Sequence, residues 1–145
     1  FPDTDALTDG VVTVRPLAAG DWEVVRDEHN NEESLRWDFV AQVCTDDEAR
    51  RQAAQARREW RLGRAARFVM VDAVSGEGAG VINVMRMGPP GIGLVGYGVL
   101  PAFRGRGFTT RALRLVTRWA FDEAGLRARS NAALVREAVT GRREP

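Results

Sequence analysis

Four runs of apolar and β-branched residues along the chain predict β-strands. The runs cover residues 11–17, 68–72, 80–85 and 92–100, and glycine or proline lies near the ends of most of them. The short turn 74–77 between the second and third runs predicts a hairpin. Gly96 and Gly98 interrupt the fourth run, which indicates a bulge or the close approach of a ligand.

More polar stretches with apolar residues at helical spacing predict helices between and after these strands. A helix is expected over 21–27 and a second short one over 32–40. The next, from a capping box at Thr45 to a glycine stop at Gly63, should turn Ala53, Ala56 and Trp60 inward. The last runs over 107–123 with one apolar side, and Gly125 ends it. The order of strands and helices predicts a domain of the α/β (α+β) class, in which helices and strands share one core.

Composition narrows the function classes. The 145 residues suit one domain, 1–145, and the formal net charge of +1 gives no overall attraction for nucleic acid or an anionic membrane. All 21 cationic residues are arginine, so the lysine of a Walker loop or of Schiff-base chemistry is missing. One cysteine and one histidine cannot form an ordinary zinc set, so we expect no metal.

The sequence carries no apolar run of membrane-spanning length and no signal pattern in residues 1–5, so we expect a cytoplasmic protein. Because residue 1 is not methionine, we expect the natural N-terminus to lie further upstream.

A glycine- and arginine-rich turn at 104–107, between a strand and a helix, predicts an anion site. Gly105 and Gly107 allow a tight curl without side-chain bulk, and the N–H groups of the following helix would face into it. Arg104, Arg106 and Arg111 add guanidinium groups suited to phosphate oxygens. A solvated basic turn is the alternative.

The turn and its neighbours resemble the GNAT superfamily of acyl-CoA-dependent N-acyltransferases. The family signature is Arg or Gln, two residues, Gly, one residue, then Gly or Ala; Arg104 and Gly107 match it, and Thr109 departs from it. Segments 9–17, 35–37, 96–101 and 110–113 resemble the branch that contains ribosomal-protein N-terminal acetyltransferases, and the resemblance covers residues 9–126. It implies a mixed, mostly antiparallel sheet, splayed at the fourth strand and flanked by helices.

The resemblance also implies acetyl-CoA or another acyl-CoA as cosubstrate, attacked directly by an amine. The residues that it places against the cosubstrate are Val99, Leu100, Arg104, Gly105, Arg106, Gly107, Phe108, Thr109 and Asn131. The glutamate that often serves as base in the family has Leu94 in its place. Tyr97 is a weak catalytic candidate, because a wall or packing role suits its position between two glycines better.

The acceptor is the least constrained partner. An acidic run at 27–33, including Glu32 and Glu33, could attract a cationic amine, and Trp37 could line the same side, although a solvated acidic face is the alternative. A peptide N-terminus and a small amine both remain open, as does a homodimer. A non-catalytic acyl-CoA sensor of the same fold and a nucleic-acid-binding module are rival interpretations. The family continues further after the long helix than this chain does, so we expect the C-terminal part to be abbreviated here.

Overall fold

A five-stranded antiparallel sheet forms the centre of the molecule. The computed structural model describes residues 1–30, 43–86 and 90–126. The strands are β1 (Leu7–Thr8), β2 (Val12–Pro16), β3 (Ala65–Asp72), β4 (Gly78–Arg86) and β5 (Gly93–Val99). They lie side by side in chain order, and each pairs antiparallel with the next, so that β5 is an edge strand of the described sheet.

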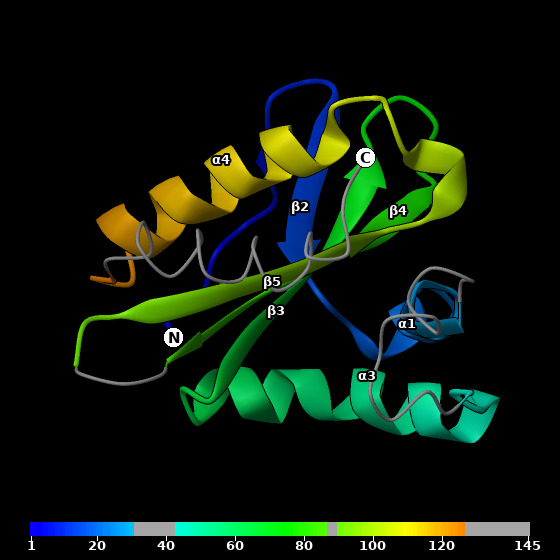
Figure 1. Cartoon of the computed structure of the whole chain (residues 1–145). Helices are drawn as coiled ribbons and strands as arrows, with labels where there is room; N and C mark the ends of the chain where they lie inside the picture. The colour runs from blue at the N-terminus through cyan, green and yellow to red at the C-terminus, as the bar shows by residue number, and fades with distance from the viewer. Residues whose placement is uncertain (31–42, 87–89, 127–145) are drawn as a thin grey trace.

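Helices cover both faces of this sheet (Figure 1). The helices α1 (Trp22–Asn30) and α3 (Asp46–Arg61) lie on one face, and α4 (Phe108–Asp122) crosses the other. Two 3-10 turns, Ala19–Asp21 and Pro101–Phe103, precede α1 and α4. The result is the single domain of flanking helices and central sheet that the sequence predicts.

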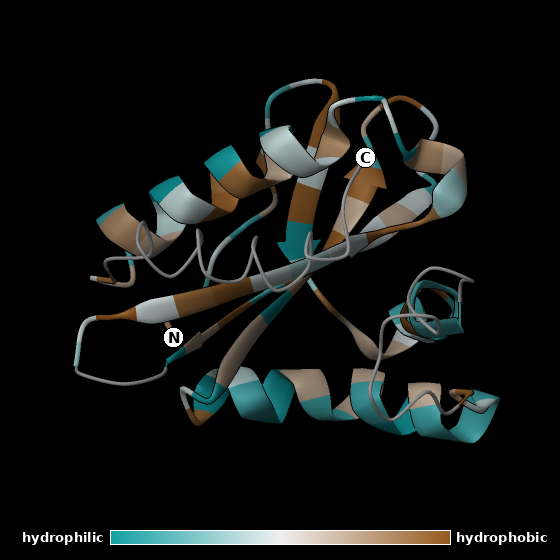
Figure 2. Ribbon diagram, in the orientation of Figure 1, coloured by the Kyte–Doolittle hydropathy of each residue, from teal (hydrophilic) through white to brown (hydrophobic). Residues whose placement is uncertain are grey.

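The two faces of the sheet bury separate apolar clusters. The cluster under α4 joins residues such as Phe68, Ile82 and Val116 to Trp60 and Trp119, whose ring centroids lie 5.4 Å apart. The cluster under α1 and α3 is smaller; its members are Leu17, Val25, Cys44, Ala49, Ala56 and Val69. Figure 2 shows the matching pattern, with hydrophilic residues on the side of α3 that faces away from the sheet.

Local capping explains why α3 begins and ends as the sequence predicts. The Thr45 hydroxyl accepts the N–H of Glu48 at 3.1 Å, which satisfies one free donor of the first turn. Gly63 follows the helix with φ of 72°, a left-handed conformation that glycine adopts without strain. Ala53, Ala56 and Trp60 are all buried, as predicted.

Several boundaries differ from the prediction. The helix expected from residue 21 begins at Trp22, because the Asp21 carboxylate accepts hydrogen bonds from Arg15 and from the Ala18 N–H within a 3-10 turn. The strand expected over 68–72 begins at Ala65, and the two-residue β1 was not predicted. The helix expected over 32–40 lies outside the described residues.

Of the two explanations given for Gly96 and Gly98, a bulge or the close approach of a ligand, the bulge is wrong. The register between β4 and β5 is regular from Gly80–Val99 to Arg86–Gly93, and the irregularity lies between Met70 and Val71 on β3. The splay expected beside β5 lies outside the described residues.

Candidate functional site

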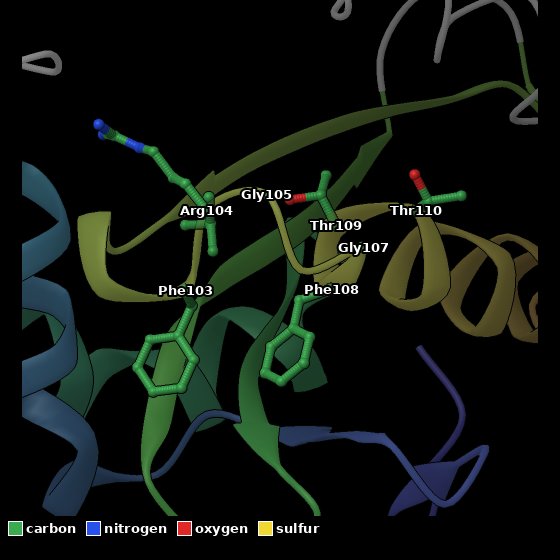
Figure 3. Close-up of a pocket in the computed structure, with 8 residues that line it drawn as sticks. Phe103, Arg104, Gly105, Gly107, Phe108, Thr109 and Thr110 are labelled. Atoms are coloured by element: carbon green, nitrogen blue, oxygen red, sulfur yellow. The ribbon is translucent and has the colours of Figure 1, made fainter.

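Two aromatic side chains anchor the turn between β5 and α4 to the core. Phe103 and Phe108 are buried, with ring centroids 5.6 Å apart, and both point into the core (Figure 3). Between them Gly105 and Gly107 adopt φ of 75° and 76°, the left-handed region that disfavours other residues. A Cβ on either glycine would meet no atom of the described residues within 4 Å. The backbone therefore curls tightly around open space.

That space is a pocket of about 240 Å³. Its lining residues are Val99, Phe103, Arg104, Gly105, Gly107, Phe108, Thr109 and Thr110. In Figure 3 the Thr109 hydroxyl points toward Gly105 across the turn. The pocket thus joins the end of β5 to the start of α4.

The start of α4 offers free hydrogen-bond donors to this pocket. The N-cap is Gly107, which has no side chain to cap the helix, and the first helical bond runs from the Arg111 N–H to the Gly107 carbonyl at 3.1 Å. No described residue accepts a hydrogen bond from the N–H groups of Phe108, Thr109 or Thr110. With the positive end of the helix dipole, these donors suit phosphate oxygens.

The end of β5 offers a second set of backbone groups. The Leu100 N–H donates to the Ala79 carbonyl at 2.7 Å, so the opposite pair Gly80–Val99 is the non-hydrogen-bonded kind. The N–H and C=O of Val99 therefore point away from β4, toward the open edge of the sheet. Leu100 differs, because its carbonyl also accepts the Phe103 N–H at 2.9 Å. Both backbone groups of Leu100 are already hydrogen-bonded within the chain.

Arg106 fastens the turn to the rest of the fold. Its guanidinium lies 3.2 Å from the Asp72 carboxylate and 5.0 and 4.9 Å from the rings of Phe103 and Phe108. Asp72 also accepts the N–H groups of Val74 and Ser75, and these bonds, together with Arg106, lower its pKa. The Arg106 side chain, which we expected on phosphate, thus lies against two aromatic rings and a carboxylate.

Arg111 is held in a similar way. It donates to Asp9 at 2.8 Å, and Asp9 also accepts the N–H groups of Val11 and Val12. Burial raises the pKa of Asp9, but these hydrogen bonds outweigh it and lower the pKa to about 2. The pair ties the β1–β2 turn to α4. Arg104 differs from Arg106, because its side chain extends away from the turn in Figure 3.

The two positions that the sequence analysis considered for proton transfer, Leu94 and Tyr97, lie on β5. Leu94 pairs with Met85 and brings no carboxylate to this strand. Tyr97 packs against the apolar cluster under α4, which is the wall or packing position that its neighbouring glycines predicted. Four other expected site residues, Glu32, Glu33, Trp37 and Asn131, lie outside the described residues.

The carboxylate of Glu28, which no sequence motif marks, lies against β5 on the face of the sheet opposite α4. A Cβ built on Gly98 would overlap the Glu28 carboxylate and lie 2.9 Å from its Cγ, so the half-buried Glu28 side chain occupies the space beside this glycine. The signal in the sequence is the glycine itself, since a strand interior with no Cβ leaves room for another element to approach.

Two classes of site do not occur in the part of the chain that the structure describes. No group of three or more histidine, cysteine, aspartate or glutamate side chains there could hold a metal ion. No described helix is both long and apolar enough to cross a membrane.

The open strand edge of the antiparallel sheet leads to an uncapped, glycine-started helix, and a family model described as an acetyltransferase (GNAT) domain matches residues 12–136. The fold, this site and the family match together identify the class of acyl-CoA-dependent N-acyltransferases. The chain belongs to this GNAT family, whose general reaction is acyl transfer from coenzyme A. No curated protein matches the sequence.

Solved structures with low sequence identity share the fold. RimL, a ribosomal L7/L12 α-N-protein acetyltransferase in complex with coenzyme A, is 16% identical with a TM-score of 0.73; the match covers 85% of this chain and 71% of that one. A ribosomal-protein-S5-alanine acetyltransferase from Vibrio fischeri is 18% identical with a TM-score of 0.72, covering 94% and 82%. A Salmonella typhimurium enzyme that modifies the N-terminal serine of L7/L12 is 17% identical with a TM-score of 0.73, covering 97% and 84%.

Proposed function

We propose that the protein transfers an acetyl group from acetyl-CoA to a primary amine by direct attack within a ternary complex. The observation that carries this proposal is the continuity of the pocket, which runs from the outward backbone of Val99 to the free N–H groups at the start of α4. An extended ligand with a diphosphate at one end and an amide-bearing arm at the other fits both sets of groups.

The residues divide between two parts of that ligand. The N–H groups of Phe108, Thr109 and Thr110 would hold the pyrophosphate, and Gly105 and Gly107 leave it room. The N–H and C=O of Val99 would pair with the pantetheine amides along the sheet edge. Arg104 would add positive charge at the mouth of the pocket. When bound, the acyl thioester supplies the electrophile, and the protein aligns it with the amine.

The acceptor that we propose is a peptide N-terminus or a small amine in the cytoplasm. Support for the peptide comes from the solved structures of similar fold, which include acetyltransferases of ribosomal proteins. The rival function is an acyl-CoA sensor without transfer activity, and Leu94 favours it because no carboxylate stands at the family's usual position. Both functions need the same pocket, so they differ only in turnover.

A thiol-release assay with acetyl-CoA and succinyl-CoA across a panel of amines and peptides separates the two. If the protein is a transferase, we expect release of free thiol that requires one class of acceptor and is faster with one of the two donors. Stabilisation by acyl-CoA with no release above the acceptor-free rate would instead support the sensor.

The variant Thr109→Asp tests whether acyl-CoA binds in this pocket. The positive end of the helix dipole stabilises a carboxylate in the first turn, so the fold should survive. The same carboxylate places negative charge where the pyrophosphate would sit. We expect at least a tenfold weaker acyl-CoA affinity by calorimetry. Thr109→Asn is the matched neutral control. Unchanged affinity in the aspartate variant would place the ligand elsewhere.

A further inference from the structure

The face of the sheet under α1 contains glycines where two residues of that helix approach. Val24 and Glu28, four residues apart on α1, occupy the places where a Cβ of Gly78 and of Gly98 would stand. The two glycines therefore let α1 lie close to β4 and β5. Val24 fills its gap with an apolar group, whereas Glu28 brings a carboxylate to the strand backbone.

The carboxylate lies beside the proposed donor site. Gly98 immediately precedes Val99, whose outward N–H and C=O face the open edge of the sheet. Gly98 is also the neighbour of Gly96 on the same face, because alternate residues of a strand share a face. A Cβ on Gly96 would meet no atom of the described residues within 4 Å. Among the described residues, none therefore fills the position beside Gly96, next to the Glu28 carboxylate.

The strands bring no competing charge to this spot. On this face of β4 and β5 the neighbours of Gly98 are Val81, its pairing partner, and Gly96. The nearby ionisable groups belong to the helices: Arg26 is bound by Asp27 and by Asp46 of α3, and His29 lies close enough to Glu48 of α3 to lower its pKa.

We propose that Glu28 is the proton acceptor for the amine substrate, and this proposal rests on the transferase function proposed above. The ammonium group of the acceptor gives one proton to the Glu28 carboxylate, directly or through one water. The neutral nitrogen then attacks the thioester carbon; the C–N bond forms, the C–S bond breaks, and the sulfur leaves with the bonding pair. The second nitrogen proton passes to the thiolate through solvent, and Glu28 releases its proton to solvent.

Glu28 brings a carboxylate to the face of β5 on which Leu94 lies. Leu94, Gly96 and Gly98 share that face, and the Glu28 carboxylate stands beside Gly98, about 13 Å further along the strand than Leu94 and next to Val99. A positioned general base contributes about 10²- to 10⁴-fold to rate.

The test compares Glu28→Gln, which keeps the shape beside Gly98 but cannot accept the proton, with Glu23→Gln, the same change at an exposed site of α1. Both variants are assayed with acetyl-CoA and the amine found by the thiol-release panel. We expect Glu28→Gln to bind acetyl-CoA within twofold of the wild type and to lose 100-fold or more in kcat/KM, chiefly in kcat. The acidic limb of its pH–rate profile should disappear. His29→Asn should keep that limb, and Glu23→Gln should behave as the wild type.

Three outcomes are decisive. A Glu28→Gln variant with wild-type kcat, or one in which only the amine KM rises while the acidic limb persists, overturns the role of Glu28 and leaves the transferase function standing. A wild-type protein that binds acetyl-CoA and releases no thiol with any acceptor overturns the transferase function and the role of Glu28 together. Retained transfer in wild type with the expected loss in Glu28→Gln supports both.

Discussion

Gly107 has two roles at the level of a single residue. Its φ of 76° is a conformation in which other residues are strained, and its missing side chain leaves the first N–H groups of α4 uncapped. The first role concerns folding and the second concerns the ligand. The first follows from the absence of a Cβ, and the second from the absence of a side-chain oxygen that could accept these N–H groups.

Gly107→Ala should therefore lower both stability and ligand affinity. The left-handed conformation costs about 1–2 kcal/mol for a residue with a Cβ, and relief of that strain would rotate the N–H groups away from the pocket. Chemical denaturation and acetyl-CoA titration measure the two effects. Gly20→Ala is the control, because that glycine has an ordinary φ and open space around it. Equal behaviour of the two variants would contradict the assignment.

Asp9 predicts a dependence of stability on acid pH. Its native pKa of about 2 lies below the ordinary 3.8, so the unfolded chain binds the proton first as the pH falls. The stabilisation from Asp9 is complete above about pH 4 and is lost as the pH falls from there toward 2. Asp9→Asn should be less stable than the wild type at pH 6, and the difference should shrink by pH 2 in urea unfolding curves. The same change at the exposed Asp5 is the matched control for the loss of a surface carboxylate.

At the scale of elements, the β4–β5 ladder contains two glycines whose substitution should affect different properties, stability for one and turnover for the other. A Cβ on Gly80 would lie 2.9 Å from the Val99 Cα and would overlap the Gly98 carbonyl, which are backbone atoms that cannot move alone. A Cβ on Gly98 would overlap the end of the Glu28 side chain, which can swing away.

Gly80→Ala should accordingly unfold more easily, by roughly 1–3 kcal/mol, as overpacked sites do. Gly98→Ala should keep most of its stability and lose turnover, because the alanine displaces the Glu28 carboxylate. Thermal unfolding and the thiol-release rate, measured on both variants, give the comparison. A Gly98→Ala variant that is fully active would count against the proposed proton acceptor.

The sequence predicted the elements better than it predicted their contacts. Hydrophobic periodicity and caps are local, so the hairpin, α3 and α4 were found with small errors at their ends. The pairing of Arg106 with Asp72 joins residues 34 apart and that of Arg111 with Asp9 joins residues 102 apart, and a linear pattern contains no sign of such partners. For this reason we expected both arginines on phosphate, whereas the structure ties each to a carboxylate. The approach of Glu28 to Gly98 escaped prediction for the same reason.

At the scale of the whole molecule, the pocket connects the sheet to α4, so a ligand that bridges them should stabilise the entire domain. Acetyl-CoA at about 100 times its dissociation constant adds about 2.7 kcal/mol to the free energy of unfolding of a protein that binds it only when folded. For a chain of this size we expect the Tm to rise by roughly 5–10 °C. Thermal unfolding with and without acetyl-CoA measures the shift, and adenosine is the control ligand without a diphosphate. No shift at saturating acetyl-CoA would contradict the pocket assignment.

The fold was accessible from the sequence because its turn signature and strand order are specific as a set. The acceptor was not, because a helix expected over 32–40 does not fix what its side chains contact, and Trp37 and the acidic pair at 32 and 33 lie outside the described residues. The donor site uses mainly backbone groups, which any sequence with the right turn can present. The acceptor site depends on side chains, which must be placed one by one.

The part of the pocket proposed to face the pyrophosphate is lined by peptide N–H groups, threonine hydroxyls and the Arg104 guanidinium, and the 145 residues include no lysine. A lysine amine is a nucleophile in its neutral form, whereas a guanidinium group stays protonated at neutral pH. A pocket that holds an acyl thioester in the proposed way would therefore supply positive charge through a group that the thioester does not acylate.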